Sequence, residues 1–202
     1  MERRDNYAIQ AQAARERFLT YDQDTIIRKF RLKFDERHLY TTMLSTPYRV
    51  SRATGDLEKL EGDRWVDANT HAEVLALFDL LCDAREDRHL SGRFVATQNF
   101  GHLFHRGLVE DTEDPQAARL DRDPERLHRA CRDLGGTPLP FADIAYRVEL
   151  FDGLPIAIHF WHSDEEFPAQ LRFQWDANTP QYIRYETMYY VLGLLRRRLA
   201  EA

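Results

Sequence analysis

The segment from Trp161 to Ala169 concentrates side chains that could do chemistry. It reads Trp-His-Ser-Asp-Glu-Glu-Phe-Pro-Ala, so three consecutive carboxylates follow an aromatic residue and precede a Phe-Pro pair. A carboxylate that is partly desolvated beside an indole ring has a raised pKa and can act as a general acid or base near neutral pH. We therefore consider Asp164 and Glu166 as candidate catalytic residues, and Trp161 and Glu165 as candidate ligand contacts.

A structural role accounts for part of the same segment. In a hairpin connection, Ser163 and Asp164 would accept hydrogen bonds from the turn backbone, and Pro168 would start an edge strand. This explanation does not account for Glu165, Glu166 or Trp161. A large aromatic residue in this position would lie either beneath another element, such as N-terminal helices, or open to a ligand.

Three segments of alternating apolar and polar residues would position this region. They predict strands near residues 143–151, 154–162 and 169–176, joined by a turn at Asp152-Gly153 and by the acidic segment. The apolar sides of these strands should face helices and form a core. The residues that define this apolar side are Tyr146, Ile158 and Phe173.

The polar side of the same strands offers further candidate ligand contacts. Strand alternation would place His159 beside Trp161, with Arg147 and Arg172 ready to bind an anion through forked hydrogen bonds. Together with Glu149, the same charged groups could equally form a cross-strand ladder of ion pairs. The sequence leaves both interpretations open.

Histidine spacing gives a weaker hint of a metal site. His102 and His105 share a face if their segment is helical, and Asp164 or Glu166 could complete a set of metal ligands. Nothing in the sequence brings these residues together, and with eight histidines in the chain such spacings are common. No metal site is therefore predicted, and no cofactor can be named.

The rest of the chain predicts an α+β fold with a mostly antiparallel sheet and helices packed on one face. We expect one domain over 1–202, made of a helical N-terminal segment (1–35), a hairpin subdomain or sheet extension (36–68) and a core (69–202). Thr70 and Glu73 form a capping box that starts one of the core helices. The acidic stretch from Glu110 to Asp123 is expected to be a mobile loop or lid.

Composition narrows the classes of function. A net charge of −6 argues against a nucleic-acid partner, which would require a basic face. No apolar run approaches the ~20 residues of a membrane span, so we expect no membrane association and a cytoplasmic location. The two cysteines provide neither a disulfide framework nor a cysteine-built zinc site, and we expect both thiols to be buried and inert.

Several landmarks from Arg88 onward resemble one known family. The most specific is the Trp-x-x-Asp-Glu-Glu-Phe-Pro-Ala pattern at the acidic segment. Accompanying landmarks are Ser91-Gly92-Arg93-Phe94, Leu134-Gly135-Gly136, Asp143 and Leu154-Pro155. With these residues the chain resembles the family catalogued as domain of unknown function 3786, which is found mostly in anaerobic bacteria and archaea and has no assigned activity.

The resemblance implies a context but no catalytic residues. Some relatives look fused to a cysteine-rich iron–sulfur segment, so an iron–sulfur or corrinoid protein is an expected partner. Our leading hypothesis is an accessory protein of anaerobic metabolism that binds a small molecule or cofactor on the polar sheet face. The alternatives are a hydrolase or lyase that uses Asp164 or Glu166 as acid/base, and an interaction module that docks through its acidic hairpin.

Overall fold

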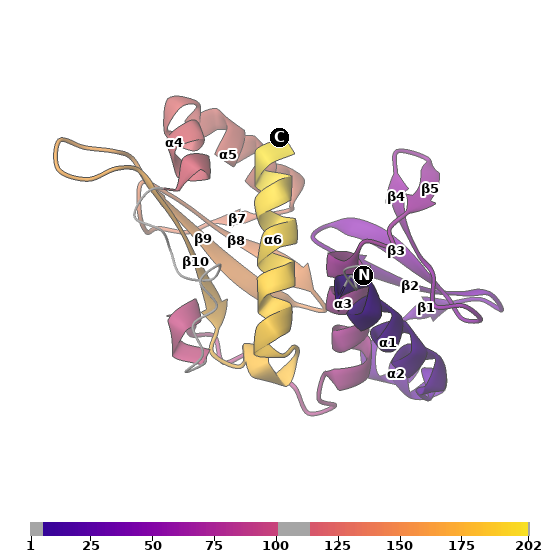
Figure 1. Cartoon of the computed structure of the whole chain (residues 1–202). Helices are drawn as coiled ribbons and strands as arrows, with labels where there is room; N and C mark the ends of the chain where they lie inside the picture. Colours follow the sequence, from indigo (N-terminus) through magenta and orange to yellow (C-terminus); the bar gives the residue numbers. More distant parts are fainter. Residues whose placement is uncertain (1–5, 101–113, 202) are drawn as a thin grey trace.

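The computed structural model describes residues 6–100 and 114–201 of the chain. Within these ranges the chain forms six α-helices and two five-stranded antiparallel sheets, which confirms the predicted α+β class (Figure 1). The buried apolar side chains of both sheets and of the helices form one hydrophobic cluster.

The sheet that carries the predicted site, here called the first sheet, is built mainly from the C-terminal half of the chain. Its strands, in sheet order, are β6 (Phe94–Ala96), β10 (Gln170–Asp176), β9 (Leu154–Trp161), β8 (Ile144–Phe151) and β7 (Thr137–Pro138). The predicted strands near 143–151, 154–162 and 169–176 are confirmed as β8, β9 and β10. Ile158 pairs with Tyr146 on one side and with Phe173 on the other, as their shared apolar face requires.

Helices cover the apolar face of this sheet. Figure 1 shows α6 (Tyr185–Glu201) crossing it, with α5 (Pro124–Asp133) beside the C-terminal end of α6. The Arg196 guanidinium of α6 lies 4.9 Å from the centre of the Phe173 ring. On the same face, Nδ1 of His128 lies 2.8 Å from the Tyr146 hydroxyl. Phe160 of β9 is fully buried.

The expectation of a lid from Glu110 to Asp123 is wrong for most of its length. Residues 110–113 lie outside the described residues, but helix α4 occupies Pro115–Arg122. Asp114 caps this helix by accepting a hydrogen bond from the backbone N–H of Gln116 (2.8 Å), and proline occupies the first helical position. Two apolar residues, Ala117 and Leu120, are buried, so the acidic composition conceals an amphipathic helix.

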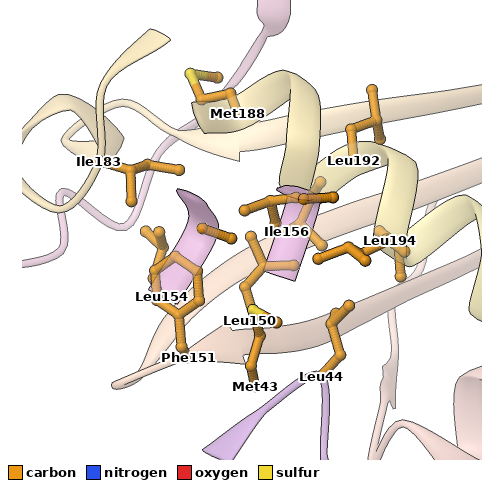
Figure 2. Close-up of a cluster of buried hydrophobic side chains, with 14 of the residues drawn as sticks. Met43, Leu44, Leu150, Phe151, Leu154, Ile156, Ile183, Met188, Leu192 and Leu194 are labelled. Atoms are coloured by element: carbon orange, nitrogen blue, oxygen red, sulfur yellow. The ribbon is translucent and has the colours of Figure 1, made fainter. Parts of the chain in front are cut away.

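Residues 33–67 form a separate second sheet and do not extend the first. Its strands run in chain order as β1 (Lys33–Phe34), β2 (His38–Met43), β3 (Thr46–Ser51), β4 (Leu57–Glu61) and β5 (Arg64–Asp67). The β2–β3 turn meets the first sheet, where the N–H of Leu44 donates to the carbonyl of Leu150 (2.7 Å). Figure 2 shows the side chains that meet at this junction, with Met43 and Leu44 facing residues of β8, β9 and α6.

The N-terminal helical segment is confirmed as α1 (Asn6–Thr20) and α2 (Gln23–Phe30). Both pack near α3 (His71–Asp83), whose residues from Ala72 to Cys82 are all buried. Phe18 of α1 stacks on Phe78 of α3 with 4.7 Å between ring centres. Because α1 and α6 both contact α3, this helix needs apolar residues around most of its circumference.

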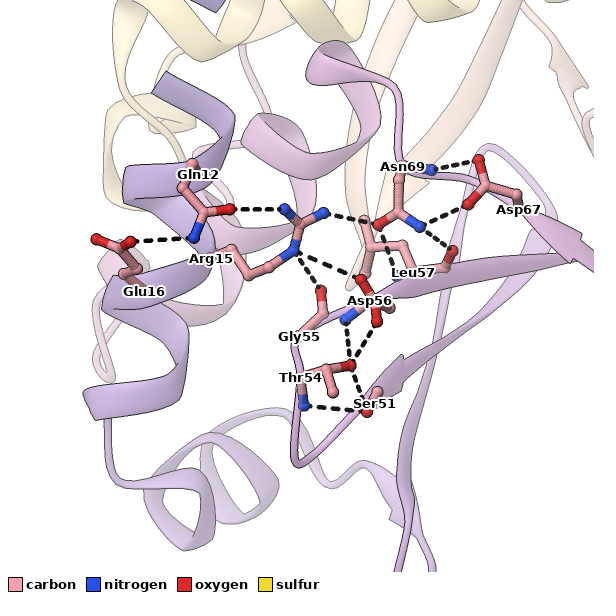
Figure 3. Close-up of polar contacts among 10 residues, drawn as sticks. All are labelled: Gln12, Arg15, Glu16, Ser51, Thr54, Gly55, Asp56, Leu57, Asp67 and Asn69. Atoms are coloured by element: carbon pink, nitrogen blue, oxygen red, sulfur yellow. Dashed lines mark hydrogen bonds and ion pairs between the residues drawn. The ribbon is translucent and has the colours of Figure 1, made fainter. Parts of the chain in front are cut away.

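A polar contact fixes α1 against the second sheet (Figure 3). Arg15 donates to the backbone carbonyl of Gly55 (3.3 Å) and to the side-chain oxygen of Asn69 (2.8 Å). Asn69 in turn pairs with the backbone N–H and carbonyl of Leu57. Gly55 adopts a φ of +70°, and a Cβ there would lie 2.7 Å from Cγ of Arg15, so both the turn and the docking of Arg15 require glycine.

The composition led us to expect no membrane span and two buried, inert thiols. Among the described residues, no helix is both long and apolar enough to cross a membrane. Both cysteines are buried, and burial raises the pKa of Cys82 to about 11 and that of Cys131 to about 12. A thiol that stays protonated at neutral pH is a poor nucleophile, in line with the predicted inert role.

Candidate functional site

The acidic segment forms the tip of the long β9–β10 hairpin, which projects away from the rest of the molecule (Figure 1). Oδ1 of Asp164 accepts hydrogen bonds from the backbone N–H groups of Glu166 (2.8 Å) and Phe167 (2.7 Å). Glu165 and Glu166 are exposed, as is Phe167 at 58%. Asp164 therefore stabilises the turn. The catalytic roles predicted for Asp164 and Glu166 stay predictions.

The base of this hairpin is held by an aspartate that the sequence analysis did not single out. Asp121 of α4 accepts a hydrogen bond from the Ser163 hydroxyl (2.6 Å), and its other oxygen lies 2.8 Å from Nδ1 of His162. The Ser163 and His162 contacts lower the pKa of Asp121. Asp143, one of the family landmarks, accepts from the backbone N–H of His162 (2.8 Å). These contacts anchor the hairpin to α4.

Trp161 belongs to a row of rings on the outer face of β9. The His159 and Trp161 rings meet edge to face at 5.7 Å, and the Phe141 ring stacks near His159 at 6.4 Å. His159 is 9% exposed and burial lowers its pKa, whereas Phe141 is 61% exposed. The N-terminal helices do not cover Trp161, since α1 packs on α3, and the indole is left half-buried.

The two arginines of the outer face lie on either side of β9. Arg172 is paired with His159 and Arg147 with Ala157, so the shared face expected from strand alternation is present. Glu149 accepts a hydrogen bond from the backbone N–H of Gly153 (2.9 Å), which ties its carboxylate to the β8–β9 turn. The structure thus brings His159, Trp161 and Arg172 together on one face, while the acids sit farther out on the hairpin tip.

Metal ligands do not converge in the described part of the chain. Across residues 6–100 and 114–201, no group of three or more histidine, cysteine, aspartate or glutamate side chains is arranged to hold an ion. His102 and His105 lie outside the described residues.

A cavity of about 300 Å³ lies elsewhere, between the second sheet and the C-terminal half of α6. Strands β3 and β4 supply one wall, the start of α3 supplies the inner end, and α6 closes the other side. Its charged lining consists of three cations and three carboxylates, and two hydroxyl groups complete the polar lining: Lys59, Arg197, Arg198, Glu61, Glu73, Glu201, Thr46 and Tyr48. We call this the Glu73 cavity, because Glu73 is its most buried charged residue, at 2% exposed.

Glu73 is held by donors from three separate segments. Oε1 accepts a hydrogen bond from the Tyr48 hydroxyl (3.0 Å) and lies 3.4 Å from Nζ of Lys59. Oε2 accepts from the hydroxyl of Thr70 (2.6 Å). Burial and the neighbouring Glu73 carboxylate raise the pKa of Tyr48, so this hydroxyl remains a donor. One half of the predicted capping box is present, since the Glu73 N–H donates to Thr70 Oγ1 (3.3 Å), but the Glu73 carboxylate faces the cavity.

One cation lies beside Glu73, and two more come from α6 across the cavity. Lys59 lies 3.4 Å from both Glu73 and Glu61 and therefore serves two carboxylates at once. Arg198 donates to the Thr46 hydroxyl and to the Leu44 carbonyl (3.4 Å). Among the described residues, the Arg197 guanidinium has no hydrogen-bond or ion-pair partner. The cavity therefore offers two arginines on one side and a buried, hydrogen-bonded carboxylate on the other.

Sequence reasoning assigned Glu73 only to helix capping and passed over Tyr48 and Lys59. A signal was nevertheless present in the sequence. The segment His71–Asp83 is apolar around nearly its whole circumference, so Glu73 and Asp79 are charges in a helix that must be buried. A buried carboxylate requires partners, and those partners could have been sought in the strands before it.

Comparison with known proteins identifies the family. A family model described as a domain of unknown function, DUF3786, matches residues 22–198. The chain belongs to this family. The match begins well before Arg88, where the sequence resemblance was expected to start. It includes the second sheet and the lining of the Glu73 cavity except Glu201. A search of curated proteins and a search of solved structures each found no match.

Proposed function

We propose that this protein binds a small organic anion in the Glu73 cavity. The observation that carries the proposal is a buried carboxylate, shared by Tyr48, Lys59 and Thr70, at the inner end of a cavity whose outer side holds two arginines. Arginine guanidinium groups bind carboxylates and phosphates through paired, charge-assisted hydrogen bonds. The anionic end of the ligand would therefore lie against Arg197 and Arg198.

The inner end of the cavity selects a different chemical group. Glu73 already accepts three donors, and a second carboxylate beside it would be repelled. A hydroxyl or amino group fits better, because it can donate to Glu73 or Glu61 and accept from Lys59 or Tyr48. A volume of about 300 Å³ suits a compact hydroxy acid, amino acid or sugar phosphate.

The proposal differs in location from the outer sheet face favoured by sequence. There, the His159 and Trp161 rings pack edge to face beside Arg172, and His159 is itself buried, whereas the Glu73 carboxylate lines a cavity. Small-molecule sites are usually concave and remove most of the ligand surface from water. The enclosed cavity is therefore the stronger candidate for a small ligand.

Isothermal titration calorimetry against a defined panel tests the proposal. The panel would contain glycerate, serine, glycerol 3-phosphate and ribose 5-phosphate, with inorganic phosphate as the reference. We expect at least one panel compound to bind more tightly than phosphate. That binding should weaken at least tenfold in Lys59→Met and in Glu73→Gln, since each loses a charged partner of the ligand.

A matched control distinguishes the loss of a ligand contact from the effect of removing a positive charge anywhere on the protein. Lys33→Met removes the same charge from the exposed strand β1 and should leave binding unchanged. Circular dichroism would confirm that each variant is folded before titration. If no panel compound binds, or if Lys33→Met weakens binding as much as Lys59→Met, the Glu73 cavity is not the site.

A second candidate function is docking of a protein partner through the β9–β10 hairpin. It is favoured by the exposure of Phe167 (58%) beside Glu165 and Glu166 on a projecting tip. Such a tip would suit a basic partner with an apolar recess, and an iron–sulfur or corrinoid protein remains the partner class that the family resemblance predicts. Binding should weaken steeply with salt, because exposed charges are screened beyond ~10 Å at 0.1 M. A pull-down insensitive to ionic strength would contradict this candidate.

A further inference from the structure

A second hollow adjoins the Glu73 cavity on the surface of α6. Its volume is about 270 Å³, and it lies between the start of α3 and one stripe of α6. Tyr189, Gly193 and Arg197 follow each other at intervals of four residues along this stripe, so they share one helix face. His71 of α3 forms part of the opposite wall. We call this hollow the Gly193 slot.

Gly193 forms an open floor for the slot. It lies in the middle of α6, where glycine is less favourable than alanine because of its backbone freedom. A Cβ built at this position meets no described atom within 4 Å, so packing in the fold does not require glycine here. Glycine at an exposed helix position allows another group to approach the backbone closely.

Aromatic rings form the sides of the slot. Tyr189 is 44% exposed, and its ring contacts that of Tyr190 at 5.8 Å. The Tyr190 and His71 rings meet edge to face with 5.9 Å between their centres. The centre of the His71 ring lies 4.7 Å from that of Tyr7. Flat faces of this kind stack on planar rings. The slot is thus suited to an aromatic ring placed over Gly193.

Arg197 connects the slot to the Glu73 cavity. Its side chain lines both hollows, and within the described ranges its guanidinium has no hydrogen-bond or ion-pair partner. A single anionic group bound to Arg197 would therefore have the Glu73 cavity on one side and the Gly193 slot on the other. A compact acid would fill only the first of these spaces.

We infer that the two hollows form one extended site, and that its ligand carries a planar aromatic ring in addition to its anionic group. The inference rests on the proposed function, since it assigns a second half to the same site. The ring lies on Gly193 between Tyr189 and His71. The anion contacts Arg197, and hydroxyl groups reach towards Lys59 and Glu73.

A matched pair of compounds tests the inference with calorimetry on the full chain. Adenosine 5′-monophosphate and ribose 5-phosphate share the sugar and the phosphate, and they differ only in the planar base. We expect the wild-type protein to bind the first about tenfold more tightly, as stacking of one base on aromatic side chains allows. Gly193→Leu fills the floor of the slot and should abolish this difference while leaving ribose 5-phosphate binding unchanged.

Two further variants guard against misreading a folding defect. Gly193→Ala should raise the Tm by roughly 1–4 °C because it removes a helix glycine, so a loss of preference in this variant cannot be blamed on instability. Ala200→Leu introduces the same side chain at an exposed position of α6 outside both hollows and should keep the preference.

The outcomes separate the inference from the proposed function. If ribose 5-phosphate binds, and its affinity depends on Lys59, but adenosine 5′-monophosphate has no advantage that Gly193→Leu removes, the slot is not part of the site and the Glu73 cavity still is. If both compounds bind, and Gly193→Leu loses the preference while Ala200→Leu keeps it, the extended site is supported. If neither compound binds, and the acids of the earlier panel also fail, both proposals fall together.

Discussion

The Glu73 cavity and the β9–β10 hairpin use similar residues in opposite surroundings. Both place carboxylates near aromatic side chains, but Glu73 is 2% exposed and shared by donors from three segments. In the hairpin, Asp164 accepts only from the backbone of its own turn, and its acidic neighbours are exposed. In water such charges contribute little to stability, whereas a buried carboxylate requires partners wherever the fold places it.

This difference shows why local sequence composition is a poor guide to the site. Three acids in a row attract attention because they are adjacent in the chain. Thr70 is a local partner of Glu73, but Tyr48 and Lys59 come from strands β3 and β4, and only the fold brings them to Glu73. Long-range pairing, which one sequence does not display, therefore decides which carboxylate is desolvated.

The largest expected change in stability contrasts a core residue of strand β9 with a residue at the tip of the β9–β10 hairpin. Phe160→Ala should lower the free energy of unfolding by about 3–5 kcal/mol, because it opens a cavity in the fully buried core. Phe167→Ala removes the same ring from the exposed tip and should change stability by less than about 0.5 kcal/mol. Urea denaturation measures both. Equal losses would show that the hairpin tip is packed against another part of the molecule.

The next effect concerns the buried carboxylate itself. Glu73→Ala should lower the free energy of unfolding by about 1–3 kcal/mol, because it leaves the Tyr48 hydroxyl without its partner in a buried position. Glu165→Ala, on the exposed tip, serves as the matched control and should have almost no effect. A Glu73→Ala protein as stable as the wild type would contradict the account of a closed polar network.

A smaller loss is expected for the turn of the hairpin. Asp164→Ala removes two hydrogen bonds to backbone N–H groups that water can replace, so it should cost about 1 kcal/mol. Hydrogen exchange should report faster exchange of the Glu166 and Phe167 amides in this variant. Unchanged exchange of both amides would show that Asp164 does not hold the turn.

The smallest expected effect is a change in the pH dependence of folding stability, caused by His159 on the outer face of the first sheet. Burial lowers the pKa of His159 below 6.5, so the unfolded chain takes up a proton at a higher pH than the folded chain does. The stability associated with neutral His159 is complete above pH 6.5 and is lost as the pH falls below that value. His159→Gln should flatten this part of the stability curve, whereas His89→Gln, at an exposed position, should not.

Much of the fold could be predicted from local pattern. The alternation in β8, β9 and β10 predicts each strand and its apolar face, because one side of each strand packs against helices. Helix α4 was missed although Asp114-Pro115 repeats the start signal of Asp123-Pro124, since acidic composition was given more weight than capping. For residues 36–68 the sequence left open whether they form a hairpin subdomain or extend the first sheet. Strand β4 was not predicted, because it lacks alternating apolar residues.

The candidate site was far less predictable. Sequence pattern correctly placed His159 and Arg172 on one sheet face, but it could not place Asp121 beside His162 and Ser163, since α4 and the hairpin are separated by some forty residues. The catalytic assignment of Asp164 and Glu166, and the ligand roles of Trp161, Arg147, Arg172, His159 and Glu165, stay predictions. Glu73 was visible as a charge in a buried helix, but its partners were not.

The most direct test of the central claim is nuclear magnetic resonance mapping of backbone amides during titration with each compound of the calorimetric panel in turn. Binding in the Glu73 cavity predicts saturable shifts at Thr46, Tyr48, Lys59 and Arg197, with the amides of Glu165 and Phe167 unmoved. Shifts confined to the β9–β10 hairpin and the outer face of β9, or no saturable shifts at all, would contradict it.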